Sequence, residues 1–284
     1  MAKKPIRFGT DGWRAGIGEE YTFENVRYCA QGTADYLLQD GLAPRGMVVG
    51  YDTRFRSEDF ARTVAEVLAG NGIPVFLADR AAATPVLSYA IVPRKAAGGI
   101  WITASHNPPS DNGYKLRSSY GGAAAPETLE RVEAGIARAQ ESEQVKSLDL
   151  DRAVRQGLIH LFDPDEAYAA QLARLVDLQV LREAGVKVVS DPMWGVGQRW
   201  FPRLLGGGRT EVIEIHGERH PLFPRMRRPE PIEENLRDLL DAIVAHGADV
   251  GLATDGDADR VGLANEKGAF VNQLQVYALL AYYL

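Results

Sequence analysis

Short apolar runs alternate with helix-spaced apolar residues along the first half of the chain. Residues 47–52 form a compact apolar run that ends on Asp52, which predicts a buried strand. The apolar residues after this run recur at helical spacing, which predicts a helix that ends at Gly70-Asn71-Gly72. These residues are Phe60, Val64, Val67 and Leu68. The same reasoning predicts strands over 73–78 and 98–103, and a helix over 84–92 whose first turn tolerates Pro85.

The alternation begins again after a polar stretch over 139–151. A helix is predicted over 235–246, where apolar residues recur at i, i+3, i+4, i+7 and i+8. The predicted strands of this half are 186–189, 211–215 and 249–253. Strands that alternate with helices predict an α/β fold with mixed, mostly parallel sheets covered by helices. We expect two consecutive α/β domains, residues 1–155 and 156–284.

Composition and charge place the chain among soluble globular proteins. Of its 284 residues, 45% are apolar and 25% are charged, which are ordinary values. A net charge of −6 argues against nucleic acid and against an anionic membrane surface as partners. No segment approaches the roughly 20 apolar residues of a membrane helix, and no secretory signal follows Lys3 and Lys4. The single cysteine, Cys29, excludes an internal disulfide and is expected to pack in a helix. We therefore expect a cytoplasmic protein.

The last residues, 273–284, predict a helix that is nearly all apolar from residue 277 onward. Terminal helices usually fray into polar residues, so this end is typical of a chain that has been cut. The alternative is a terminal helix that is buried in a dimer interface. In either case self-association through this helix is possible.

An acidic loop follows the apolar run over 250–253. Its residues Asp255, Asp257 and Asp259 stand at i, i+2 and i+4, which places them on one side of an extended chain. Three carboxylates forced together repel one another unless a cation neutralises them, and hard oxygen ligands suit Mg²⁺ or Ca²⁺. The loop therefore predicts a metal site, with a solvated acidic turn as the alternative.

The same loop nearly fits the calcium-binding loop of an EF-hand, with Glu266 at its twelfth position. Position six, however, is Arg260, where the tight turn of that loop needs glycine. The flanking residues 249–253 and 261–264 also predict strands rather than helices. The EF-hand is therefore excluded, and a cation beside the metal indicates that a phosphate is held there too.

A second candidate segment ends a predicted strand on Ser105, between Ala104 and His106. A serine at the carboxyl end of a parallel strand is well placed to face a cleft, to which Lys115 could return. Asn112-Gly113 indicates a turn. Neighbouring side chains on an extended chain point to opposite faces, so a Ser-His hydrolase dyad is not expected, and no G-x-S-x-G motif is present.

Other polar residues give weaker indications. The run over 8–14 carries two glycines and Arg14, which predicts either an anion-cradling loop or an ordinary turn. Arg54 and Arg56 follow a strand and could contact phosphate, although solvated surface arginines are the commoner outcome. Four histidines form no ligand spacing, and two tryptophans are expected in the core or in an interface: His160, His216, His220, His246, Trp194 and Trp200.

Taken together, these segments resemble the α-D-phosphohexomutase superfamily, the phosphoglucomutase and phosphomannomutase group. Residues 9–14 resemble its N-terminal signature, and residues 255–260 resemble its metal loop. Residues 103–109, with 112–115, resemble its phosphoserine loop. The order and separation of the three segments make the resemblance specific, and it runs over essentially the whole chain.

The resemblance implies a role for each candidate residue. Ser105 would carry the phosphoryl group, and its phosphate would bind Mg²⁺ together with the three aspartates of the loop. His106 and Lys115 would be candidates for general acid and base at the sugar hydroxyl. Arg14 and Arg260 would steady the phosphoryl group. A phosphoserine near −2 beside three carboxylates requires such cations.

The resemblance also implies the reaction. Phosphoserine would donate its phosphoryl group to a hexose monophosphate, glucose or mannose phosphate, and the resulting hexose bisphosphate would return its other phosphate to the serine. Family enzymes have four domains, with sugar recognition in the third and phosphate binding in the fourth. Neither is found in this sequence, so we expect the chain to match the first two domains and to have little activity alone.

Two other functions stay open from the sequence. One is a non-catalytic module that binds a metal or a sugar phosphate. The other is a phosphatase that uses an aspartate of the Asp255-Gly256-Asp257 segment as its nucleophile, for which no early D-x-D loop is present.

Overall fold

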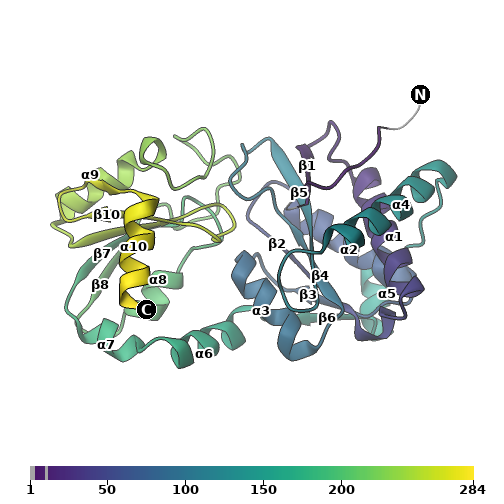
Figure 1. Ribbon diagram of the computed structural model, residues 1–284, viewed down its shortest axis with the longest axis horizontal. Coiled ribbons are helices and arrows are strands. Elements are labelled where there is room, and N and C mark those ends of the chain that lie inside the picture. Colours follow the sequence, from purple (N-terminus) through teal and green to yellow (C-terminus); the bar gives the residue numbers. More distant parts are fainter. Residues whose placement is uncertain (1–3, 10–11) are drawn as a thin grey trace. The chain divides into compact units, whose positions relative to one another are not determined.

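The computed structural model describes residues 4–9 and 12–284 of the chain (Figure 1). It divides into two compact units, one formed by Met1–Ala104 and Ser110–Tyr168, the other by Ser105–Pro109 and Ala169–Leu284. Each unit contains its own sheet and its own hydrophobic core. The α/β class expected from the alternation is confirmed.

The first unit is built on a six-stranded sheet with the order β1-β5-β4-β2-β3-β6. The strands β4, β2, β3 and the edge strand β6 run parallel, whereas β5 and β1 are antiparallel to their neighbours. The sheet is therefore mixed and mostly parallel, as predicted. Its strands are β1 (Trp13–Gly16), β2 (Met47–Tyr51), β3 (Val75–Ala78), β4 (Gly98–Ile102), β5 (Asp111–Arg117) and β6 (Ile159–Phe162).

Helices cover this sheet on both faces, which explains why β2 is buried at every position. On one face α3 lies so close that a Cβ at Gly50 would come within 2.4 Å of Leu87. The other face packs against α1 and α2, and α4 packs on α1. The helices of the unit are α1 (Phe23–Gln39), η1 (Ala43–Arg45), α2 (Ser57–Gly70), α3 (Thr84–Arg94), α4 (Pro126–Ser142) and α5 (Leu150–Arg155).

The second unit is built on a five-stranded sheet with the order β11-β10-β9-β7-β8. Its β9, β7 and β8 are parallel, and β10 and β11 are antiparallel additions. The strands are β7 (Lys187–Asp191), β8 (Glu211–Glu214), β9 (Val250–Thr254), β10 (Val261–Asn265) and β11 (Phe270–Val271). The helices are α7 (Leu178–Glu183), α8 (Trp200–Leu205), η2 (Glu233–Asn235), α9 (Arg237–His246) and α10 (Gln273–Tyr283), and α6 (Asp165–Leu175) crosses the division.

Helix α9 shows why the helical spacing of the second half was informative. Leu239 and Ile243 are fully buried, and a Cβ at Gly251 of β9 would lie 2.4 Å from the side chain of Ile243. The apolar stripe thus packs directly on the strand that leads into the acidic loop. The helix begins at Arg237 rather than at residue 235, because residues 233–235 form a 3₁₀ turn.

Two sequence expectations differ from the structure. Asn112-Gly113 is not a turn but lies inside β5, where Asn112 pairs with Ala15 of β1 and its amide donates to Ser57 at 2.9 Å. The tertiary pairing overrides the local turn preference. The structural division also falls after Tyr168 rather than at residue 155, because β6 pairs with β3 and so belongs to the first sheet.

The last helix, α10, forms the yellow end of the chain in Figure 1. Large apolar side chains of this helix are exposed. Leu274, Tyr277 and Tyr282 are 81%, 74% and 93% exposed. The expected self-association through this helix stays a prediction. Within the described part of the chain, no helix combines the length and the apolar character needed to cross a membrane.

Candidate functional site

The acidic loop joins β9 to β10 in the second unit. The two strands pair antiparallel up to Thr254 and Val261, so the loop is the closed end of a hairpin. The flanking strands are as predicted, but the loop is a turn and not an extended chain, and Ala258 has a left-handed backbone with φ of 55°. The turn still gathers Asp255, Asp257 and Asp259, which place one carboxylate oxygen each within 4.8 Å of the other two.

Asp255 is the most constrained of the three aspartates. Its side chain is buried, and Oδ1 accepts the backbone N–H groups of Asp259 and Arg260 at 3.0 and 3.1 Å. Burial raises the pKa of the Asp255 carboxyl well above its usual range, and the charges of Asp257 and Asp259 raise it further. A divalent cation would relieve this penalty, since its two positive charges offset most of the three negative charges where water cannot. The donor set therefore fits a hard cation with oxygen ligands, such as Mg²⁺.

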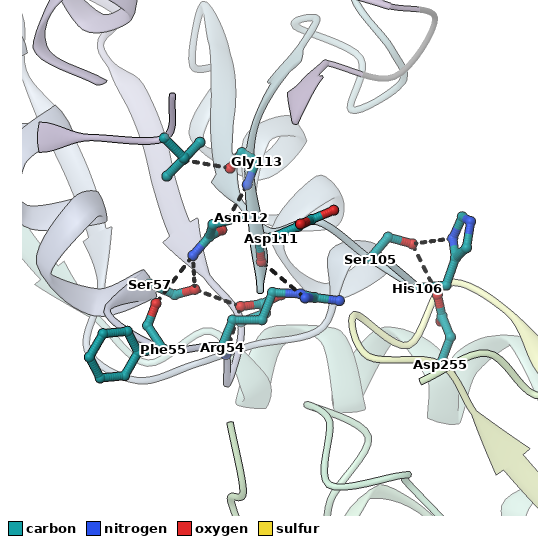
Figure 2. Close-up of polar contacts among 11 residues, drawn as sticks. Arg54, Phe55, Ser57, Ser105, His106, Asp111, Asn112, Gly113 and Asp255 are labelled. Atoms are coloured by element: carbon teal, nitrogen blue, oxygen red, sulfur yellow. Dashed lines mark hydrogen bonds and ion pairs between the residues drawn. The ribbon is translucent and has the colours of Figure 1, made fainter. Parts of the chain in front are cut away.

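Ser105 lies beside this loop and belongs to the same unit (Figure 2). Its Oγ donates to Asp255 Oδ2 at 3.0 Å, although the two residues are 150 positions apart. The contact is close because Gly256 has no side chain: a Cβ there would lie 2.6 Å from the carbonyl oxygen of Ser105. The structure thus brings the predicted phosphate carrier to the predicted metal ligands.

The backbone at Ser105 corrects one sequence argument. Ser105 is not extended but left-handed, with φ of 54°, so its side chain and that of His106 do not point to opposite faces. Its Oγ lies 3.2 Å from His106 Nδ1 (Figure 2). A non-glycine residue in this region costs free energy and persists only where its surroundings hold it, which is common at functional sites. His106 is consequently within reach of a proton on Oγ.

Arg14 and Lys115 lie in the first unit, on the adjacent strands β1 and β5. Arg14 pairs with Gly113, where an added Cβ would lie 3.1 Å from the Arg14 side chain. Lys115 is only 1% exposed, and a Cβ at Gly12 would come within 3.1 Å of its side chain. The two cations therefore lie near each other at the same end of the sheet. Thr10 and Asp11 of the N-terminal signature lie outside the described residues.

Arg260 differs from the other predicted residues because its side chain is 46% exposed. Its guanidinium forms an ion pair with Glu230 at 2.9 Å, and Glu230 also pairs with Arg228 at 2.6 Å. Glu230 thus orients Arg260 at the rim of the loop. The sequence reasoning did not identify Glu230.

The expectation for Arg54 is wrong: it is neither a surface residue nor exposed to a ligand. Its side chain has no exposed area, and Nε forms an ion pair with the buried Asp52 at 3.2 Å. Another of its N–H groups donates to the backbone oxygen of Asp111 at 3.1 Å (Figure 2). Asp52 also accepts from the hydroxyl of Ser57 at 2.7 Å. Arg56 is on the surface as expected, 47% exposed and paired with Asp59.

A second histidine takes part in a polar cluster that its sequence position did not reveal. His216 lies between two carboxylates, with Nδ1 3.0 Å from Asp191 and Nε2 3.3 Å from Asp238. Trp194 is buried, as expected, and its ring stacks on the imidazole. Cys29 is fully buried, and burial raises the pKa of its thiol, in agreement with a packing role.

The fold and these segments define a class of protein. Residues 5–143 match the family model described as phosphoglucomutase/phosphomannomutase, alpha/beta/alpha domain I, and residues 166–268 match domain II of the same family. The chain belongs to this family, within the α-D-phosphohexomutase superfamily.

Individual relatives agree with this assignment. The chain is 33% identical over 279 residues to "Probable phosphoglucosamine mutase" of Methanothermobacter thermautotrophicus, covering 98% of this chain and 58% of the relative. It is 33% identical to "Phosphoglucomutase/phosphomannomutase" of Thermococcus kodakarensis, covering 96% and 58%. A solved structure described as "putative phosphomannomutase" of Thermus thermophilus superposes with a TM-score of 0.87 at 38% identity, covering 99% and 61%. The chain thus spans less than two thirds of the length of these relatives.

Proposed function

We propose that this chain carries the phosphoserine and the metal site of a phosphohexomutase, an isomerase that interconverts hexose 1-phosphate and hexose 6-phosphate. The hydrogen bond from Ser105 Oγ to Asp255 supports this proposal most directly. It joins the predicted phosphate carrier to the carboxylate cluster across 150 positions of sequence. We propose glucose or mannose phosphates as substrates, with a hexose bisphosphate as the intermediate.

In the proposed reaction the phosphoryl group moves between two oxygens. The bond from phosphorus to Ser105 Oγ breaks as a bond from phosphorus to a sugar hydroxyl oxygen forms. The hydroxyl proton passes to a base, for which Lys115 and His106 are the candidates, and Oγ takes up a proton. The reverse transfer, from the other phosphate of the bisphosphate, restores the phosphoserine and releases the isomeric monophosphate. Positioning and charge neutralisation dominate such transfers.

The remaining charged residues would bind the metal ion and the phosphoryl group. Asp255, Asp257 and Asp259 would bind Mg²⁺, which would offset part of the negative charge of the carboxylates and of the phosphoserine beside them. Arg14 and Arg260 would steady the phosphoryl group through charge-assisted hydrogen bonds. Glu230 keeps Arg260 oriented through the ion pair at 2.9 Å.

The proposal is tested by incubating the 284-residue chain with glucose 1,6-bisphosphate or mannose 1,6-bisphosphate and Mg²⁺. We expect one phosphate to be transferred to Ser105, with release of one hexose monophosphate, as measured by intact mass and phosphopeptide mapping. Continuous turnover of hexose monophosphate is expected to be slight for these residues alone. A chain that binds divalent metal but accepts no phosphate from either bisphosphate would favour the non-catalytic binding module.

Metal binding can be tested separately with Asp257→Asn. In the wild-type chain Mg²⁺ is expected to raise the midpoint of thermal unfolding, because it binds the folded loop alone. Asp257→Asn removes one charge from the cluster, so the metal-free variant is expected to unfold at a temperature equal to or above that of the wild type. Its response to Mg²⁺ is expected to be lost.

The matched control for this measurement is Asp241→Asn. The Asp241 side chain is 76% exposed on α9, where it contributes only to a weak surface pair with Arg237. This variant is expected to keep the full response to Mg²⁺. If Asp257→Asn kept it as well, the three aspartates would not form the metal site.

A further inference from the structure

The loop that follows β7, residues 192–197, forms the wall behind the acidic loop. Val196 donates its N–H to the backbone oxygen of Gly256 at 3.2 Å. A Cβ at Gly195 would lie 2.7 Å from that same oxygen, and one at Gly197 would meet the hydroxyl of Thr254. The two loops therefore pack backbone to backbone. Gly256 stands between Asp255 and Asp257, so a shift of the wall moves both carboxylates.

The wall does not keep its conformation by local preference. Met193 and Trp194 both have left-handed backbones, with φ of 50° and 56°, which non-glycine residues rarely adopt. Asp191, at the end of β7, accepts the N–H of Met193 at 2.7 Å. Two successive residues in this region need further support from outside the loop.

His216 supplies that support through three contacts. Its Nδ1 lies 3.0 Å from the same Asp191 oxygen that accepts from Met193. Its backbone oxygen accepts the N–H of Trp194 at 3.2 Å, and its ring stacks on the indole at a centroid distance of 3.7 Å. The imidazole thus fixes both the turn at Asp191 and the position of Trp194.

The other side of the imidazole is tied to helix α9. Nε2 lies 3.3 Å from Asp238, in the first turn of that helix, and Arg225 pairs with Asp238 at 2.8 Å. Since α9 packs on β7 and β9, this contact connects the wall to the rigid part of the sheet. His216 is 13% exposed on its side chain, so it is an internal link rather than a surface group.

We propose that His216 is a positioning residue for the metal loop: it holds residues 192–197 against Gly256 and so sets the spacing of Asp255 and Asp257. The inference rests on the proposed metal site. His216 touches neither metal nor substrate in this role. Groups of this kind, which orient metal ligands without being ligands, change metal affinity when they are replaced.

The experiment measures Mn²⁺ affinity of the 284-residue chain by titration calorimetry, well below the unfolding temperature. His216→Phe keeps a ring to stack on Trp194 but loses both carboxylate contacts. We expect its Kd for Mn²⁺ to rise about tenfold, at the low end of the usual range for such groups. His246→Phe, at the exposed end of α9, is the matched control and is expected to bind as the wild type does.

A double-mutant cycle with Asp238→Asn separates positioning from general destabilisation. Asp238 is partly exposed, with 25% of its side-chain area accessible. If His216 acts through its link to α9, Asp238→Asn weakens Mn²⁺ binding in the same direction. The double variant is then no weaker than His216→Phe alone, since both changes break one chain of contacts. A merely structural role would lower the unfolding midpoint and leave the Kd of the folded chain unchanged.

The Mn²⁺ titrations distinguish failure of the positioning role from failure of the metal site. Unchanged Mn²⁺ affinity in His216→Phe, with a wild-type chain that binds Mn²⁺, overturns the positioning role and leaves the metal site standing. A wild-type chain that binds no Mn²⁺ overturns both. If His216→Phe does not fold, Asp238→Asn decides alone, and wild-type affinity in that variant overturns the inference.

Discussion

Ser105→Ala is expected to accept no phosphate from glucose 1,6-bisphosphate, under conditions in which the wild-type chain takes up one. The variant lacks the oxygen that would receive the phosphoryl group in the proposed reaction, the Oγ that lies beside His106 and Asp255. Intact mass and phosphopeptide mapping measure the difference directly. The loss is complete rather than graded, because the bond to phosphorus cannot form.

Mn²⁺ binding provides the internal control for Ser105→Ala. The hydroxyl contributes one hydrogen bond to Asp255, whose loss costs about 1 kcal/mol, so the variant is expected to keep its metal site. Ser110→Ala is the matched variant from the end of the same loop, where the side chain is exposed and donates to Asp111. It is expected to take up phosphate as the wild type does.

The same experiment separates the alternative functions. Phosphate that persists in Ser105→Ala and maps to Asp255 or Asp257 would favour the phosphatase with an aspartate nucleophile. A hydroxylamine-labile phosphate would identify such an acyl phosphate chemically. Phosphate that is absent from the wild type as well, in a chain that binds Mn²⁺, would favour the binding module.

The sequence predicted those features that depend on local spacing. The helix face of Phe60, Val64 and Leu68 and the apolar stripe of α9 both repeat every three to four residues. The first is buried as expected, and so are Leu239 and Ile243 of the stripe, whereas Val244 at its end is 61% exposed. The acidic loop is likewise local, since its three aspartates lie within five consecutive residues. The parallel strands followed from continuous apolar runs that only a sheet covered on both faces can bury.

The features that the sequence did not predict depend on distant residues. Ser105 has a left-handed backbone beside the loop that follows β9, and nothing in its own neighbourhood specifies this. Asn112 lies in a strand because β1, from the start of the chain, pairs with it. His216 stands far in sequence from Asp191 and from Asp238. In each case a tertiary contact decides the role, and a single sequence does not show which residues meet.

Arg54→Met is expected to destabilise the first unit by about 3–5 kcal/mol, which is a large fraction of the stability of an ordinary domain. The replacement leaves the carboxyl of Asp52 in the interior without its cation, and neither side chain of the pair is solvated, with 0% and 1% exposure. Urea unfolding at room temperature measures the loss. Hydrogen exchange locates it, and the fastest-rising amides are expected in β2, β4 and β5.

Two variants test whether the pair itself is responsible. Arg56→Met, two residues further on, removes an exposed arginine from a surface pair and is expected to cost less than about 1 kcal/mol. The double variant Asp52→Asn with Arg54→Met removes both charges and is expected to recover much of the loss, because no buried charge is left without a partner. Equal losses of unfolding free energy in Arg54→Met and Arg56→Met would contradict the stabilising role of the buried ion pair.

The pH dependence of the stability of Arg54→Met follows from the pKa of Asp52. Burial raises the pKa of the Asp52 carboxyl above its unfolded value, and the charge of Arg54 is the largest influence that lowers it. Removing Arg54 therefore raises that pKa further. A carboxyl with a raised folded pKa loses stability as the pH rises from its unfolded to its folded pKa, since the folded state keeps a proton that the unfolded state releases. The loss of unfolding free energy in Arg54→Met is therefore expected to shrink at a pH below that range, where Asp52 is neutral in both the folded and the unfolded state.

The buried pair also bears on the proposed phosphorylation site. Asp52 accepts a hydrogen bond from Thr103, and Arg54 donates to the backbone of Asp111, so the pair is bonded on both sides of residues 105–109. A loop whose two ends are fixed in this way loses less entropy when it holds Ser105 in a left-handed conformation. Arg54→Met is therefore expected to slow phosphate uptake at Ser105 even where the variant is folded, whereas Arg56→Met leaves the rate unchanged. A wild-type rate in folded Arg54→Met would restrict the pair to stability alone.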